Sequence, residues 1–83
     1  MPPRKAVGSV HSTRYRAFLK RLRQARVVAR LTQADVATAL GRPQSFVAKC
    51  ESGERRVDVV ELEQFADLYS RRLSFFLPKT KSD

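Results

Sequence analysis

The sequence predicts an all-α protein, a compact bundle of five helices. Apolar residues recur at helical spacing along most of the chain, and capping pairs precede two of these runs. No stretch shows the strict alternation typical of a β-strand. At 83 residues with 42% hydrophobic content, the chain suits one small globular domain.

The chain divides into three parts. Residues 1–11 contain two prolines and a glycine among basic residues and show no hydrophobic period, which predicts a flexible basic arm. The folded domain is expected to cover residues 12–77. Residues 78–83 are predicted to form a polar C-terminal tail, because they open with a proline that stops the last helix.

The first helix is predicted to begin at Ser12 or Thr13 and is the most basic element of the chain. Its apolar stripe follows the spacing i, i+3, i+4, i+7, i+10 and consists of Tyr15, Phe18, Leu19, Leu22 and Ala25.

Two short helices are expected next. Thr32 and Asp35 form a pair resembling a capping box at the start of the second helix. Gly41 supplies the left-handed residue that commonly ends a helix. Pro43 suits the beginning of the third helix, which is predicted to run to about Ser52.

The fourth helix is predicted to begin at Asp58, which forms a second such pair with Glu61. Its apolar stripe contains Val59, Leu62, Phe65, Ala66 and Tyr69. A short fifth helix is expected over residues 73–77.

Charge is distributed unevenly along the chain, whose formal net charge is +9. Residues 1–30 hold nine Lys or Arg and no acid, whereas residues 31–83 hold eight of each sign. This imbalance favours a polyanionic partner, nucleic acid ahead of an anionic membrane surface. The alternative is a basic tail that only aids solubility.

Several classes of function find no support in the sequence. Cys50 is the single cysteine, so no disulfide is possible, and with His11 as the other soft ligand no metal site is expected. Cys50 falls on an inward stripe and is interpreted as a small buried hydrophobe rather than a redox sensor. No nucleophile–base pair, pair of inward carboxylates or glycine-rich phosphate loop occurs, so neither enzyme activity, a cofactor nor a small-molecule ligand is expected. No signal or membrane segment appears, which favours the cytoplasm.

The third helix carries an unusual polar face. Gln44, Ser45 and Lys49 project from one side of it. An ordinary solvated face would look similar, but two short helices joined by a tight glycine turn form the helix-turn-helix pattern. Gln can pair with adenine, Lys can donate to guanine and Ser can bond a base or a phosphate, so this context favours DNA binding.

The segments LTQADVATALG, PQSFVAKCESGERR and VELEQFADLY resemble the Cro and phage-repressor type of helix-turn-helix regulators, the XRE-like family. The resemblance covers about residues 14–77. It implies a lambda-repressor-like fold and a regulator, repressor or autoregulator, that binds a double-stranded DNA operator as a homodimer. The third helix would then enter the major groove.

The resemblance also implies roles for single residues. Gln44, Ser45 and Lys49 would face base edges, and Arg26 would pair with Glu51 as a structural ion pair. Gln33 would hold a phosphate and brace Gln44. The candidate phosphate contacts are Gln33, Arg42, Phe46, Ser52, Arg55, Arg56 and Arg14, and the two in the loop after the third helix are expected close to the DNA backbone.

The sequence departs from the family pattern at a few positions. Arg30 stands where a glycine usually closes the first helix, and Ser70 stands where a glycine usually follows the fourth. Phe75 replaces a polar residue in the last helix. Phe75 and Leu77 are therefore candidates for a dimer interface. The alternative for Phe75 is a place in the apolar core.

An antitoxin or antiactivator that chiefly binds a partner protein is the alternative function. The acidic fourth helix and the LSFFL segment would provide its surface.

Overall fold

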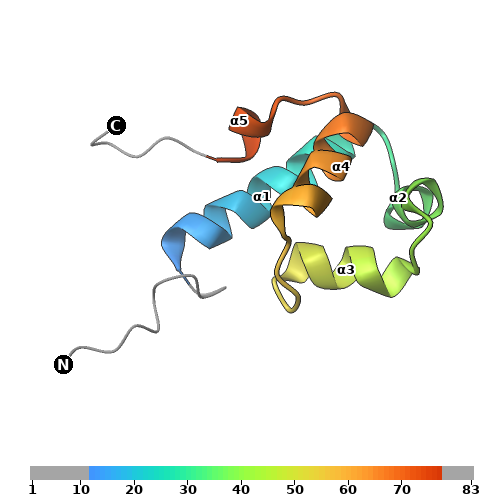
Figure 1. Ribbon diagram of the computed structural model, residues 1–83, viewed down its shortest axis with the longest axis horizontal. Helices are drawn as coiled ribbons and strands as arrows, with labels where there is room; N and C mark the ends of the chain where they lie inside the picture. Colours follow the sequence, from blue (N-terminus) through green and yellow to red (C-terminus); the bar gives the residue numbers. More distant parts are fainter. Residues whose placement is uncertain (1–11, 78–83) are drawn as a thin grey trace.

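A computed structural model describes residues 12–77 of the chain. Its helices are α1 (Thr13–Val28), α2 (Gln33–Leu40), α3 (Gln44–Ser52), α4 (Val59–Tyr69) and α5 (Leu73–Phe76) (Figure 1). No strand occurs within the described residues, so the predicted fold class is confirmed. The predicted arm 1–11 and tail 78–83 lie outside the described part of the chain.

The helices begin where the sequence pairs predicted. At α2 the side chain of Thr32 accepts from the amide of Asp35 at 3.0 Å, and the Asp35 carboxylate accepts from the Thr32 amide at 2.9 Å. Asp58 and Glu61 form the same reciprocal box at α4. Ser12 caps α1 by accepting from the amide of Tyr15 at 3.1 Å. These bonds satisfy amide groups that have no partner inside the helix.

A three-residue turn joins α2 to α3. Gly41 has a φ of 67°, in the left-handed region that glycine adopts most easily. Pro43 has a φ of −65° and is the N-cap of α3, so the helix begins one residue later than expected. The turn brings α2 and α3 into direct contact.

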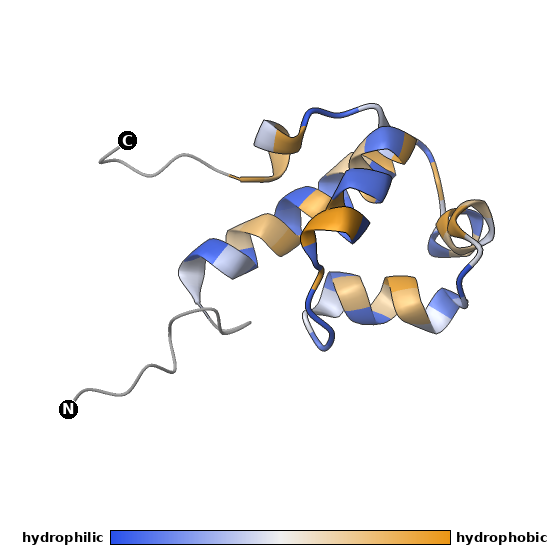
Figure 2. Ribbon diagram, viewed as in Figure 1, coloured by the Kyte–Doolittle hydropathy of each residue, from blue (hydrophilic) through white to orange (hydrophobic). Residues whose placement is uncertain are grey.

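One apolar core lies between the helices. α1 packs against α3, α4 and α5, while α2 packs against α3 and α4. Figure 2 shows apolar and polar residues alternating along each ribbon, as expected where one face of each helix is buried. Cys50 is fully buried, as its place on the inward stripe predicted. The largest fully buried side chains are Phe65, Phe76, Leu22, Val36, Val47 and Cys50.

Within residues 12–77, two residues other than glycine have left-handed backbone conformations. Arg30 has a φ of 62° just after α1, and Ser70 has a φ of 55° just after α4. These are the two positions at which the family pattern predicts glycine. The chain therefore keeps the backbone path of these turns without the residue that adopts it at least cost.

Candidate nucleic-acid interface

The outer face of α3 is polar and open to solvent. Gln44, Ser45 and Lys49 are all exposed, whereas Val47 and Cys50 on the inner face are fully buried. In Figure 1, α3 lies along the lower edge of the molecule. The exposed face therefore offers amide, hydroxyl and ammonium groups of the kinds that bond base edges in a major groove.

An ion pair fixes the C-terminal half of α3 to α1. Arg26 donates from Nε to Oε2 of Glu51 at 2.6 Å and from Nη2 to Oε1 at 3.2 Å. Its Nη1 also donates to the carbonyl of Leu31 at 2.9 Å. Hydrogen bonding to Glu51 raises the pKa of Arg26. The structure thus brings together the two residues that the family resemblance paired.

Gln33, the first residue of α2, joins the same network. Its Nε2 donates to Oε1 of Glu51 at 3.0 Å, so one carboxylate links α1, α2 and α3. Among the described residues no hydrogen bond joins Gln33 to Gln44, the residue that it was expected to brace. In this structure Gln33 instead supports the position of α3 through Glu51.

A second buried carboxylate holds two arginines near the start of α4. Arg55 donates from Nη1 and Nη2 to the two carboxylate oxygens of Glu61, each at 2.8 Å. Arg42, in the turn before α3, donates from Nη2 to Oε2 of the same residue at 3.3 Å. Hydrogen bonding from Arg55 lowers the pKa of Glu61 below the ordinary value of a glutamate. The sequence indicated Glu61 only as a capping residue, because pairs across loops leave no periodic signal.

Phe46, a predicted phosphate contact, belongs to this cluster. Its ring is 7% exposed and stacks on Phe65 with centroids 6.3 Å apart. The guanidinium carbons of Arg42 and Arg55 lie 4.0 and 4.8 Å from the ring centroid. Its amide already donates to the carbonyl of Pro43 at 3.0 Å. The ring therefore contributes to the apolar core, and a phosphate contact from Phe46 stays a prediction.

Arg55 therefore acts as an internal brace. Its two terminal nitrogens both bond Glu61, and Nη1 also donates to the carbonyl of Arg56 at 3.0 Å. Arg42 contacts Glu61 through one nitrogen only, and its side chain is 42% exposed. Of the two, Arg42 keeps more donors for a group outside the protein.

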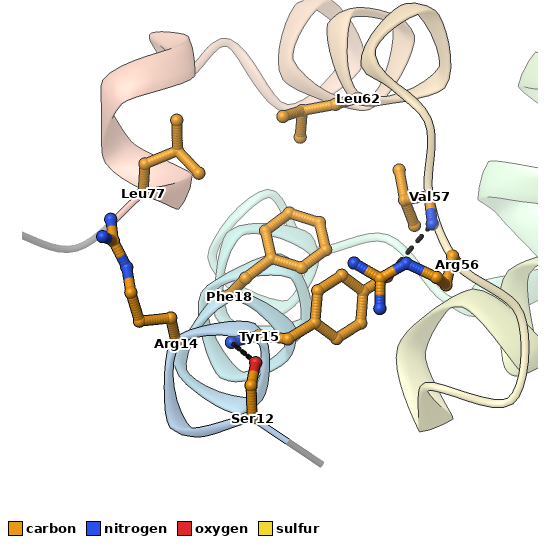
Figure 3. Close-up of a pocket in the computed structure, with 8 residues that line it drawn as sticks. All are labelled: Ser12, Arg14, Tyr15, Phe18, Arg56, Val57, Leu62 and Leu77. Atoms are coloured by element: carbon orange, nitrogen blue, oxygen red, sulfur yellow. Dashed lines mark hydrogen bonds between the residues drawn. The ribbon is translucent and has the colours of Figure 1, made fainter. Parts of the chain in front are cut away.

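Arg14 and Arg56 lie on opposite sides of a pocket of about 290 Å³ (Figure 3). The guanidinium carbon of Arg56 is 4.2 Å from the centroid of the Tyr15 ring, and the Tyr15 hydroxyl accepts from the amide of Val57 at 3.0 Å. Both arginines are exposed and neither has an ion-pair partner among the described residues. Both are therefore available to an anionic partner.

Ser52 closes the end of α3. Its hydroxyl donates to the carbonyl of Lys49 at 3.2 Å and accepts from the amide of Glu54 at 3.2 Å. Because the residue is exposed, a phosphate could reach its hydroxyl. A phosphate contact there would compete with these two local hydrogen bonds.

Phe75 is partly covered by its own chain. Its ring meets that of Phe76 edge-on with centroids 5.3 Å apart. The guanidinium carbons of Arg21 and Arg71 lie 5.2 and 4.7 Å from its centroid, and Arg21 also donates to its carbonyl at 2.9 Å. Leu77 remains 55% exposed. Of the two candidate interface residues, Leu77 therefore offers more apolar surface.

Neither a metal cluster nor a membrane-spanning helix occurs in the described part of the chain. In residues 12–77 no group of three or more His, Cys, Asp or Glu side chains is placed to hold a metal ion. Within the same residues no helix combines the length and apolar character needed to cross a membrane.

Comparisons with known proteins agree with this geometry. The model of a family described as helix-turn-helix domain matches residues 14–71. A solved structure, an XRE-family like protein from Pseudomonas syringae pv. tomato str. DC3000, is 42% identical, with a TM-score of 0.75. The alignment covers 87% of this chain and 88% of that chain. The chain belongs to the XRE-type helix-turn-helix family. No curated protein matches the chain.

As a member of this family, the protein is a DNA-binding regulator. The family-model match runs from the first turn of α1 to just beyond α4 and includes the whole helix-turn-helix. The predicted family and fold type are both confirmed.

Proposed function

We propose that this XRE-type protein binds a specific double-stranded DNA operator as a homodimer, with α3 in the major groove, and acts as a repressor or autoregulator. The observation that carries the proposal is the division of α3 into two faces. Gln44, Ser45 and Lys49 stand exposed on one, while Val47 and Cys50 are fully buried on the other. A major groove accepts one helix, and such a helix reads bases with its exposed side chains.

The two buried carboxylates support this role by holding α3 rigidly. Glu51 ties its last turn to Arg26 and Gln33, and Glu61 ties the segments before and after it through Arg42 and Arg55. A helix whose backbone is already held in place loses less conformational entropy on binding.

Phosphate contacts are proposed from residues around α3. Arg14 and Arg56 are the strongest candidates because neither has an ion-pair partner in the described residues, and Arg42 follows with its remaining donors. Gln33, Ser52 and Arg55 already bond within the domain, so phosphate contacts from them would use the donors that remain. Such contacts fix position and carry no sequence information.

A homodimer is proposed because one helix-turn-helix reads only a few base pairs. Two copies would place two α3 helices about 34 Å apart on one side of the duplex. Leu77 and the partly covered Phe75 are proposed to contribute to the contact between copies, since Leu77 is 55% exposed.

The decisive experiment begins with selection of bound sequences from random DNA, followed by affinity measurements on the selected operator. Gln44→Ala or Lys49→Ala should each weaken operator binding by about 1–3 kcal/mol and change the preferred base at one position. Helix propensity favours alanine, so the fold should persist, and circular dichroism checks this.

Thr38→Ala is the matched control, because Thr38 is exposed on α2 and outside the proposed interface. It should leave operator binding unchanged. A Gln44→Ala, Lys49→Ala double variant that discriminates operator from random DNA as well as the parent would refute the base-reading role of α3. Binding that showed no sequence preference even in the parent would instead favour the antitoxin or antiactivator alternative.

A further inference from the structure

One side of α1 forms a groove of about 850 Å³ that is both basic and apolar. Val27 and Val28 are 55% and 57% exposed at its C-terminal end. We call this surface the basic groove. Gln24 of α1 and the α3 residues Glu51, which is paired with Arg26, and Ser52 complete its lining. The α1 residues on which the proposal rests are Arg16, Leu19, Lys20, Arg23, Val27 and Val28.

An opposite pattern occupies the exposed side of α4. Val59 and Val60 are 73% and 59% exposed in its first turn, which is strongly apolar in Figure 2. Glu63 and Asp67 follow at helical spacing and are also exposed. We call this surface, Val59, Val60, Glu63 and Asp67, the acidic strip.

The charges on both surfaces are available. Lys20, Arg23, Glu63 and Asp67 make no ion pair within 4.0 Å in the part of the chain that the structure describes. Elsewhere in that part, acidic side chains such as Glu51 and Glu61 are buried and paired. Exposed valines beside unpaired charges are typical of a surface that another molecule covers.

The two surfaces match in register. From Val27 back along α1, Arg23 and Lys20 lie four and seven residues away, or about 6 and 10.5 Å along the helix axis. From Val60 forward along α4, Glu63 and Asp67 lie three and seven residues away, or about 4.5 and 10.5 Å. If the two helices lie antiparallel, Val27 is opposite Val60, Arg23 is opposite Glu63, and Lys20 is opposite Asp67.

We propose that two copies of this chain associate through these surfaces, with α1 of one copy antiparallel to α4 of the next. Val27 packs on Val60, Arg23 pairs with Glu63, and Lys20 pairs with Asp67. A second copy fits better than DNA, because a phosphate backbone would leave the valines of the groove uncovered. The chain also carries the complementary surface itself.

This contact is heterologous, because it joins different surfaces of two identical chains. It is therefore distinct from the contact proposed around Leu77, and each copy retains one groove and one strip for further copies. Together the two contacts would let pairs of copies bind neighbouring DNA sites cooperatively.

The test measures self-association without DNA, by sedimentation velocity over a range of protein concentrations. Arg23→Glu alone and Glu63→Lys alone should each weaken the association at least about tenfold, because each places like charges opposite each other. An equimolar mixture of the two variants should recover association near the parental level. In the mixture, the intact groove of one variant meets the intact strip of the other.

Controls match the charge changes away from both surfaces. Arg72→Glu and Glu54→Lys alter exposed residues outside the groove and the strip, and should leave association unchanged. Single variants that associate like the parent, or a mixture that fails to recover while both variants remain folded by circular dichroism, would overturn the proposal. Loss of DNA binding by Arg23→Glu with unchanged self-association would also overturn it and would assign the basic groove to DNA.

Discussion

Single residues in this domain carry backbone conformations that their side chains disfavour. Arg30 follows α1 with a φ of 62°, and its exposed side chain makes no ion pair within the described residues. A left-handed conformation costs an L-residue roughly 1–2 kcal/mol, part of which glycine would avoid. The turn is kept because the α1–α2 junction places Arg26, Leu31 and Gln33 around Glu51.

Arg30→Gly should therefore stabilise the domain, because it relieves the strain of the left-handed conformation. The net gain should be about 0.5–1 kcal/mol, since ordering a glycine on folding costs more conformational entropy than ordering an arginine backbone. Urea unfolding followed by circular dichroism measures the change. Ala29→Gly is the matched control, because Ala29 has an ordinary helical φ of −75°. It should destabilise by about 0.5–1 kcal/mol. Equal effects of the two substitutions would contradict the role assigned to the backbone.

At the scale of elements, α3 is positioned by carboxylates that lie outside its polar face. Glu51 holds its last turn, and Glu61 holds the arginines that flank it. Burial makes these groups sensitive to loss of a partner, since an unpaired buried charge is costly. Stability of the helix-turn-helix and DNA binding are therefore separable by mutation.

Glu61→Gln should destabilise the domain by about 2 kcal/mol at neutral pH, because it weakens the bonds from Arg55 and Arg42. The pKa of Glu61 is lowered in the folded state, so its contribution is present above the ordinary glutamate pKa and lost as pH falls through the folded value. Between about pH 7 and pH 3, the free energy of unfolding should fall less steeply with decreasing pH in the variant than in the parent. Glu54→Gln, at an exposed position outside the groove and the strip, is the control and should match the parent.

For the whole molecule, charge separates into a basic half around α1 and an electrically neutral remainder. A field of this kind speeds encounter with DNA, while only groups in contact with phosphate set the salt dependence of affinity. Arg55 and Arg56, neighbours in sequence, should therefore behave differently, since Arg55 is bonded to Glu61 and Arg56 stacks on Tyr15 at the surface.

Arg56→Ala should weaken binding to all DNA sequences alike and reduce the salt slope of the affinity by about 1, with little change in stability. Arg55→Ala should instead lower the unfolding free energy, because it leaves Glu61 short of a partner. Operator affinity measured at several salt concentrations, beside urea unfolding, separates the two effects. An unchanged salt slope in Arg56→Ala would remove that residue from the phosphate contacts.

Local signals predicted most of the elements. The pairs Thr32–Asp35 and Asp58–Glu61 placed the starts of α2 and α4, and Gly41 placed the end of α2. Helical spacing also separated the exposed Gln44 and the other polar residues of α3 from its buried side. These features depend on neighbours within about four residues, which periodicity and capping rules describe well.

The contacts that the sequence did not indicate all depend on distant parts of the chain. Phe46 is enclosed by Phe65 and two arginines. The spacing of Arg55 and Glu61 across a loop gave no sign of their ion pair, and the cover over Phe75 comes from α1 and the α4–α5 loop.

By itself the sequence determined the all-α class, the helix limits and the polar face of α3, because capping, glycine turns and helical periodicity act locally. The tertiary structure alone decided that Arg42 and Arg55 form ion pairs inside the domain with Glu61. Glu51 and Glu61 each accept hydrogen bonds from segments outside their own helix. These bonds form only because α1, α2 and α4 pack around α3. That packing leaves Gln44, Ser45 and Lys49 facing outward and leaves Arg14 and Arg56 available to a partner.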